Sequence, residues 1–431
     1  MSSVASHPDR SFPRLHPRPA RGWLNDPNGI HFADGRWHVF FQHNPASARH
    51  EDIAWGHVSS ADLLRWEDHG VALQPQPGAA DSFGCWTGVG LVDDGVATLL
   101  YSGVRALDGR SSVMLARAEG DGWAQSPHVA VGMPDDDAML HVRDPFVFTL
   151  GGRRWGIQGA GTKAGAPLIL LYDATDLRSW EYQGILLDGA DPVAAGLPPS
   201  TVWECPQLVR VGDDWVLIAS LWLNGVTTDV VSLVGSLEAD DATGLPRFVP
   251  RAAGLLDDGP SFYAPQAVQA GGGEDPERIL LWGWARELAP DGVRARSQAD
   301  ADAVGWSGTL TSPLELVVDG DRAFTVPARE LTALRGEPIV DAIPDQAELL
   351  LAGTGQVELW LAADGEPGQR LYSSELAGGA LRILIDASLV EVFPDGGTST
   401  TLRAYPADGE SYRLVVGPDV TVQGWELRLL D

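Results

Sequence analysis

The chain repeats itself at a spacing of about 59 residues, and this period constrains the fold more than any other feature. Asp26, Cys85, Asp144, Glu204 and Tyr263 follow one another at intervals of 59, 59, 60 and 59 residues. Each is followed by an apolar strand-like run, a turn rich in Gly or Asp, and a second apolar run, a pattern typical of β-hairpins. Five equal β units predict a closed ring, a five-bladed β-propeller whose central strands come from the same place in every unit.

The pattern changes after about residue 325. Residues 326–337 could form a short connecting helix or turn, and from residue 338 onward alternating apolar residues return, as in 357–361 and 389–393. Short alternating strands of this kind fit a β-sandwich. The sequence therefore predicts four segments. They are a flexible N-terminal segment (1–15), the propeller catalytic domain (16–325), a linker (326–337) and a β-sandwich domain (338–431).

The composition of the chain restricts the kinds of partner that the protein can bind. The formal net charge of −29 disfavours binding to nucleic acid or to an anionic membrane surface, and it is easiest to reconcile with a small neutral substrate. No run approaches the roughly 20 apolar residues of a membrane span, and the first 19 residues lack the apolar core of a signal peptide. Two cysteines, Cys85 and Cys205, form no disulfide framework or metal motif. We therefore expect a cytoplasmic protein without a cofactor, possibly a homo-oligomer.

Three short motifs place acids at corresponding points of the repeat. They are WLNDPNG (23–29) with Asp26, RDP (143–145) with Asp144, and WECP (203–206) with Glu204. Taken singly, the first is a good turn sequence and the second could hold a simple ion pair. Acids in equivalent positions on three blades, however, would converge at the ring centre and repel one another, so that one keeps a proton near neutral pH. One ionised and one protonated carboxyl group suit the cleavage of a glycosidic bond.

These motifs resemble the three acid signatures of glycoside hydrolase family 32, the β-fructofuranosidases. Further similarity lies in FQHNP (41–45), WGH (55–57), FYAPQ (262–266) and WSGTL (306–310), and the resemblance covers about residues 15 to 431. It implies a propeller followed by a β-sandwich. It also implies a retaining enzyme that forms a covalent fructosyl intermediate, with about 5–5.5 Å between the nucleophile and the acid.

The resemblance also implies roles for particular residues. Asp26 would be the nucleophile, Glu204 the general acid and base, and Asp144 the stabiliser of the transition state, with Arg143 adjusting its charge. Trp23, Trp55 and Trp86 would supply apolar walls. The substrate-binding residues would be Asn25, Gln42, His50, Trp55, Trp86, Thr87, Arg143, Tyr263 and Trp284.

The chain departs from the family pattern where the leaving group is expected to bind. His50 stands where a tryptophan is usual, and residues 86–89 read WTGV in place of Phe-Ser-Gly-Ser. The substrate is therefore open between sucrose, a sucrose phosphate and short fructooligosaccharides, as is the linkage preference. A fructosyltransferase with the same acids, an inverting arabinan-type propeller glycosidase and a non-catalytic sugar-binding propeller remain alternatives.

Overall fold

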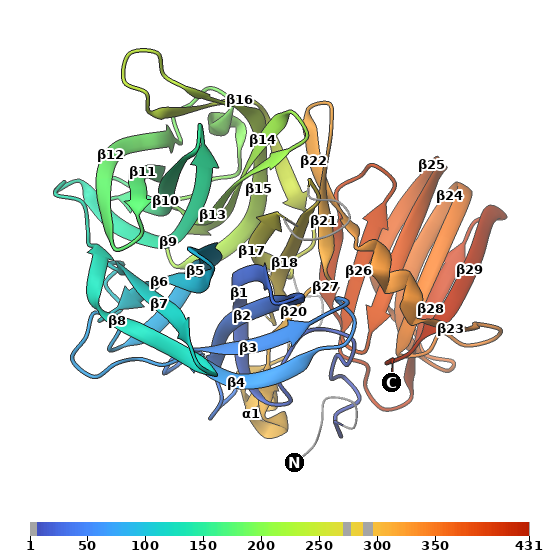
Figure 1. The fold of residues 1–431 in the computed structure, drawn as a ribbon. Helices are drawn as coiled ribbons and strands as arrows, with labels where there is room; N and C mark the ends of the chain where they lie inside the picture. The colour runs from blue at the N-terminus through green and yellow to red at the C-terminus, as the bar shows by residue number, and fades with distance from the viewer. Residues whose placement is uncertain (1–6, 270–276, 288–295, 431) are drawn as a thin grey trace.

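A ring of five β-sheets and a second all-β unit beside it make up the protein (Figure 1). This computed structural model describes residues 7–269, 277–287 and 296–430. The predicted fold class, a five-bladed β-propeller followed by a C-terminal β-sandwich, is confirmed.

The strands of each blade follow one another along the chain. Blade I contains β1 (Gly22–Ala33), β2 (Arg36–Asn44), β3 (Ala54–Ser60) and β4 (Glu67–Leu73). Blade II contains β5 (Gly84–Asp93), β6 (Val96–Val104), β7 (Ser112–Glu119) and β8 (Gly122–Val131). Blade III contains β9 (Met139–Leu150), β10 (Arg153–Thr162), β11 (Pro167–Asp176) and β12 (Ser179–Asp188). The 3₁₀ helix η2 (Ala194–Gly196) leads to blade IV, which contains β13 (Val202–Val211), β14 (Asp214–Leu223), β15 (Val226–Ala239) and β16 (Pro246–Asp257).

Blade V and the segment after it close the ring. The blade contains β17 (Phe262–Gln269), β18 (Ile279–Ala285), β20 (Thr309–Leu310), β21 (Leu314–Asp319) and β22 (Arg322–Pro327). Between β18 and β20 the chain passes through helix α1 (Gln298–Val304) and then β19 (Trp306–Ser307), which pairs in parallel with the start of β1. The first strand of each blade touches its neighbours around the axis, and β17 touches β1.

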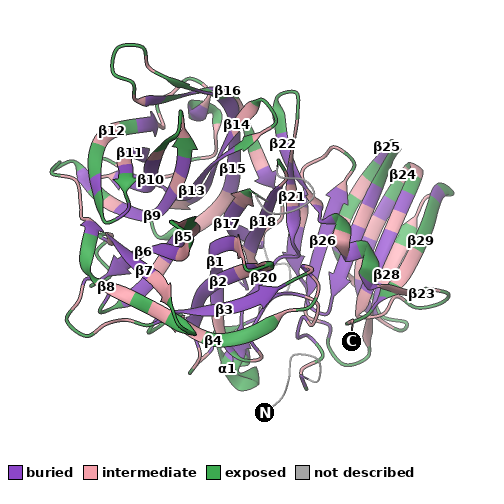
Figure 2. Cartoon of the chain, in the orientation of Figure 1, coloured by how far each residue is buried: buried purple, intermediate pink, exposed green. Residues whose placement is uncertain are grey.

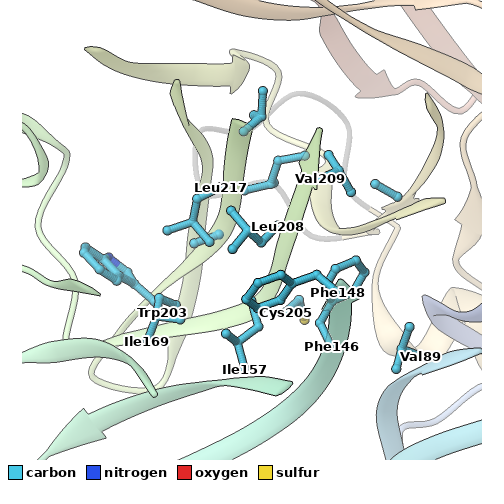
Figure 3. Packing of buried hydrophobic residues seen from close by; sticks show 14 of the residues in the cluster. Val89, Phe146, Phe148, Ile157, Ile169, Trp203, Cys205, Leu208, Val209 and Leu217 are labelled. Carbon is cyan, nitrogen blue, oxygen red and sulfur yellow. The ribbon is translucent and has the colours of Figure 1, made fainter. Parts of the chain in front are cut away.

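Polar side chains tie one blade to the next near the axis. The Asn28 side-chain oxygen accepts the Gly88 N–H (3.0 Å), and the Gln266 side-chain oxygen accepts the Ile30 N–H (2.8 Å). These bonds satisfy backbone donors that no sheet ladder reaches. The apolar faces of blades II to V pack in one large core cluster, and two smaller clusters join blade I to its neighbours. Buried residues follow the inner strands (Figure 2). Figure 3 shows Phe148 of β9 and Leu208 of β13 among the residues that meet in this core.

Blade I also contains a stack of histidines. The His31 and His38 rings are 5.0 Å apart between centroids, and the His38 and His57 rings are 5.1 Å apart. A nitrogen of His38 lies 2.9 Å from one of His57. Burial lowers the pKa of His31 to about 4 and that of His57 to about 2, so the stack is uncharged at neutral pH.

The C-terminal unit is one sheet of long strands that fold over their own core. It contains β23 (Arg335–Pro338), β24 (Gln346–Ala363), β25 (Gln369–Asp386), β26 (Leu389–Pro394), β27 (Thr400–Arg403), β28 (Glu410–Val416) and β29 (Asp419–Leu427), and the 3₁₀ helix η3 (Arg329–Leu334) precedes it. The first half of β24 pairs with β29 and the second half with β28. Leu349 and Leu359, one from each half, lie in the same buried cluster, so the two halves face each other across one core.

Buried polar contacts join the two units. His16, from the segment before β1, lies 2.8 Å from Asp386 and 3.2 Å from Glu391, and the Ser312 hydroxyl donates to Glu391. These acids raise the pKa of His16 to about 9 against the effect of its burial. The domain boundaries given above stay a prediction. In the part of the chain that the structure describes, no helix has the length and apolar character needed to cross a bilayer.

Candidate active site

A cavity of about 460 Å³ opens at one end of the propeller axis, and all three predicted acids line it. Its walls come from the inner strands of the blades and from the connections beside them. The lining residues are Trp23, Asn25, Asp26, Gln42, His50, Trp86, Thr87, Val104, Ala106, Leu107, Gly109, Arg110, Ser111, His141, Arg143, Asp144, Glu204, Trp222, Thr227, Tyr263 and Trp284.

Asp26 is held at the cavity floor by donors on both of its oxygens. β1 has an irregularity between Leu24 and Pro27, where the regular register with β2 is interrupted. The Asn25 side-chain N–H donates to one oxygen of Asp26 (3.0 Å), and Gln42 (3.0 Å) and the Thr87 hydroxyl donate to the other. Burial raises the pKa of Asp26 to about 6, and the hydrogen bond from Thr87 opposes that rise. The group is therefore ionised at neutral pH but loses its charge in mild acid.

Asp144 occupies a bulge that recurs in blades III, IV and V. Its φ is 63°, and Cys205 and Ala264 have φ of 48° and 45° at the corresponding points of β13 and β17. A proline follows each of the three residues, and in each strand the regular pairing is interrupted there. Non-glycine residues rarely adopt this conformation, which is concentrated at functional sites.

The bulges correct one sequence prediction. Equal spacing placed Glu204 in the position equivalent to Asp144, and this is wrong, because Cys205 occupies that position. Glu204 pairs with Ser220 as the last regular residue before the bulge, as Arg143 does in blade III and Tyr263 in blade V. Asp144 and Glu204 are 60 residues apart, one residue fewer than Asp144 and its structural equivalent Cys205. A difference of one residue along a strand points the side chain in a different direction.

Glu204 is therefore held by its equivalents on the two neighbouring blades. The Arg143 guanidinium donates to one oxygen of Glu204, at 2.8 Å from Nε and 2.7 Å from Nη2, and the Tyr263 hydroxyl lies against the other oxygen. Tyr263 also contacts the Leu221 carbonyl at 3.0 Å. The exposed fraction of the Glu204 side chain is 13%, compared with 7% for Arg143, so the carboxyl group stays open to the cavity.

The acids are linked to one another through Cys205 and Arg143. The Cys205 sulfur lies 3.8 Å from Asp26 and 3.5 Å from Asp144, and the Cys205 N–H donates to Asp144 at 2.9 Å. Burial raises the pKa of Asp144 to about 7, although the nearby Arg143 cation opposes this. Asp144 is therefore protonated in a substantial fraction of the molecules near neutral pH.

Aromatic side chains build the wall on the side of blade I. The His50 ring is set edge to face against Trp23 (5.7 Å between centroids) and Trp86 (5.8 Å), and Trp284 lies 5.9 Å from Trp23. Among the predicted substrate-binding residues, Trp55 is the one that does not line the cavity. Trp55 is fully buried, and its indole N–H donates to the Trp86 carbonyl (3.2 Å), so it supports the wall from behind.

Several lining residues were not identified from the sequence. Cys205 follows Glu204 in the WECP motif, and only the acid of that motif was predicted to belong to the site. The His141 and Trp222 rings lie 5.1 Å apart, and Trp222 is 5.7 Å from the Arg143 guanidinium. Trp222 is brought near Glu204 by its strand pairing with Val202, which is a feature of the fold. One sequence feature could have identified His141, which is two residues from Arg143. The connection between β6 and β7 carries no such feature.

The cavity combines three carboxyl groups with aromatic walls and fixed hydrogen-bond donors. This arrangement is typical of a glycosidase active site. Across the described residues, no group of three or more His, Cys, Asp or Glu side chains could hold a metal ion. The class that fold and site define is thus a propeller glycosidase.

Comparison with known proteins identifies the family. The family model described as "Glycosyl hydrolases family 32 N-terminal domain" matches residues 16–327. The chain is 34% identical to a sucrose-6-phosphate hydrolase of Klebsiella pneumoniae, over 92% of this chain and 89% of that protein. It is 32% identical to a raffinose invertase of Escherichia coli, over 92% of this chain and 90% of that protein. The chain belongs to glycosyl hydrolase family 32, and it is a β-fructofuranosidase.

Solved structures agree on the fold. A family 32 β-fructofuranosidase of Bombyx mori superposes with a TM-score of 0.79 at 24% identity, covering 97% of this chain and 94% of that one. A sucrose-6-phosphate hydrolase of Lactobacillus gasseri superposes with a TM-score of 0.81 at 22% identity, covering 99% and 95%.

Proposed function

We propose that the enzyme hydrolyses sucrose or short fructooligosaccharides with retention of configuration, through a covalent fructosyl intermediate on Asp26. In the first step an Asp26 oxygen forms a bond to the anomeric carbon. The bond from that carbon to the leaving oxygen breaks, and Glu204 gives its proton to that oxygen. In the second step water attacks the same carbon, Glu204 takes a proton from the water, and the bond to Asp26 breaks.

The different surroundings of the two acids support this assignment. Asp26 accepts hydrogen bonds from Asn25, Gln42 and Thr87, which favour its ionised form and fix its direction. Glu204 keeps its carboxyl group open to the cavity, where it can exchange a proton with a leaving group or a water molecule. Asp144 lines the same cavity and would bind ring hydroxyls and stabilise positive charge on the sugar.

The charges at the cavity floor favour a neutral sugar. Asp26, Asp144 and Glu204 lie beside the Arg143 cation, which is already paired with Glu204. A phosphate on the fructosyl unit would meet net negative charge in a place sheltered from water. We therefore propose an uncharged fructosyl unit, with the aromatic wall and His50 contacting the sugars. The cytoplasmic location and a possible homo-oligomer stay predictions.

The observation that carries the proposal is the convergence of the three acids in one cavity. The wild-type enzyme should release free fructose from sucrose and kestose faster than from inulin, levan or a sucrose phosphorylated on its fructosyl unit. Proton NMR of the first product should show the anomer of the substrate. The opposite anomer would refute the covalent step, and mainly transferred fructose at high sucrose would make the enzyme a fructosyltransferase.

Two variants test the roles of the acids. Asp26→Ala and Glu204→Ala should each lower kcat by several orders of magnitude while circular dichroism shows a folded protein. The Glu204→Ala variant should lose least activity on a fructoside with a good leaving group, because such a group departs with little help from a proton. Near-normal activity of either variant on sucrose would exclude the role proposed for that acid.

A further inference from the structure

The connection between β6 and β7, residues 105–111, is here called the rim loop, because five of its residues line the cavity. It belongs to blade II but is fastened to blade III. The Val142 N–H donates to the Gly109 carbonyl (3.1 Å), and the Ser111 hydroxyl donates to the Val142 carbonyl (2.7 Å). Gly109 has a φ of 83°, and a Cβ atom there would lie 2.1 Å from a nitrogen of His141. The loop is therefore held directly beside Arg143.

The rim loop presents an apolar side chain to the cavity. Leu107 lines the cavity and yet is 72% exposed. The Trp222 ring lines the same cavity and lies 5.7 Å from the Arg143 guanidinium, which binds Glu204. Trp222 thus lies on the side of the proposed proton donor, where the leaving group must depart. The hydrogen bonds from the rim loop to Val142, the residue before Arg143, place the loop on the same side.

Arg110 adds hydrogen-bond donors to this wall. Its side chain is exposed and lines the cavity, and among the described residues its guanidinium has no hydrogen-bond partner. Its backbone is fixed, because its N–H donates to Asp108 (3.0 Å) and the residue forms a parallel bridge with Val142. A pyranose ring offers both features that such a wall can bind, a face of C–H groups and a rim of hydroxyls.

We propose that the rim loop and Trp222 form the binding site for the leaving group, and that Leu107 and Arg110 bind a pyranose ring there. Leu107 covers the apolar face of the ring, and Arg110 donates to its hydroxyls. This inference rests on the proposed function, because it assigns the part of the cavity into which the leaving group moves. It makes Leu107 and Arg110 specificity residues, with no part in bond cleavage.

The test compares two substrates that share the fructosyl unit. Sucrose carries a pyranose leaving group that reaches the rim loop, whereas methyl β-D-fructofuranoside carries only a methyl group. Leu107→Ala should lower kcat/KM for sucrose by about tenfold, equivalent to about 1.4 kcal/mol. The loss should appear mainly as a higher KM, because a binding contact made equally in the ground and transition states leaves kcat unchanged. Activity on the methyl fructoside should stay within twofold of the wild type.

Leu140→Ala is the matched control. Leu140 is an exposed leucine (38%) of β9, two residues before Val142, to which the rim loop is fastened. It does not line the cavity. This variant should behave as the wild type on both substrates. Arg110→Gln should repeat the selective loss on sucrose, since it shortens the side chain and leaves two of the five N–H donors.

The outcomes separate this inference from the proposed function. Release of fructose from the methyl fructoside by the wild type supports the proposed function independently of the loop. If Leu107→Ala then lowers activity on both substrates equally, or on neither, the rim loop is not the leaving-group site. If the wild type cleaves neither substrate, the proposed function itself fails.

Discussion

Replacing Asp26 with asparagine should make the folded protein more stable at neutral pH, although it removes the proposed nucleophile. Asp26 is buried with its charge among Asn25, Gln42 and Thr87, and burial raises its pKa from 3.8 to about 6. Ionised Asp26 therefore raises the free energy of the folded protein, whereas in the unfolded chain the same group is in water. An amide fits the same place, because the Gln42 side-chain oxygen has no partner and can accept the new N–H after the Gln42 amide rotates.

The raised pKa of Asp26 sets the size of the expected gain in unfolding free energy. A shift of about two pH units corresponds to about 3 kcal/mol at 1.36 kcal/mol per unit, which is an upper limit for the gain in unfolding free energy at pH 7. The sign follows from the raised pKa. Asp26 is ionised in the unfolded chain above pH 3.8, but in the folded protein only above about pH 6. The advantage of Asp26→Asn should thus be full at pH 7, shrink as the pH falls through 6, and vanish below 3.8.

Urea unfolding of both proteins, repeated between pH 3.5 and pH 7.5, measures this difference. Asp93→Asn is a control of opposite sign, because the hydrogen bond from Arg117 holds the pKa of Asp93 below its ordinary value. That variant should lose stability above pH 4. If Asp26→Asn is less stable than the wild type at pH 7, or if the gap does not close in acid, the reasoning from burial is refuted.

Three further perturbations probe the site and its blade. Thr87→Val removes a bond that lowers the pKa of Asp26, so the acid limb of kcat/KM, which we expect near pH 6, should move to higher pH; an unchanged profile would contradict this. His57→Phe removes a group whose pKa burial lowers, so acid unfolding monitored by tryptophan fluorescence should shift to lower pH, and a shift upward would exclude the stack as an acid-sensitive element. Ser102→Ala removes the acceptor (2.8 Å) of the Asp144 N–H and should cost about 1–3 kcal/mol in chemical denaturation, whereas no loss would mean that another group or water replaces it.

Much of the architecture could be predicted because the repeat is written into the chain. Local patterns of apolar runs and Asp-Gly turns specify hairpins, and a constant period requires that equal hairpin units meet in equal ways. The motifs around Asp26, Asp144 and Glu204 likewise mark residues that the fold brings into one cavity. The sequence alone was sufficient to determine the ring, the all-β second unit, and which three acids meet in the cavity of the ring.

Only the tertiary structure decided how these residues face one another. The bulge that gives Cys205 the place predicted for Glu204 is a matter of one residue of register, which a period of about 59 residues cannot resolve. Trp55 lies behind the cavity wall, and the rim loop of blade II is fastened to Val142 of blade III. Such contacts join residues that are distant along the chain, and their geometry follows from packing between blades, which no local pattern records.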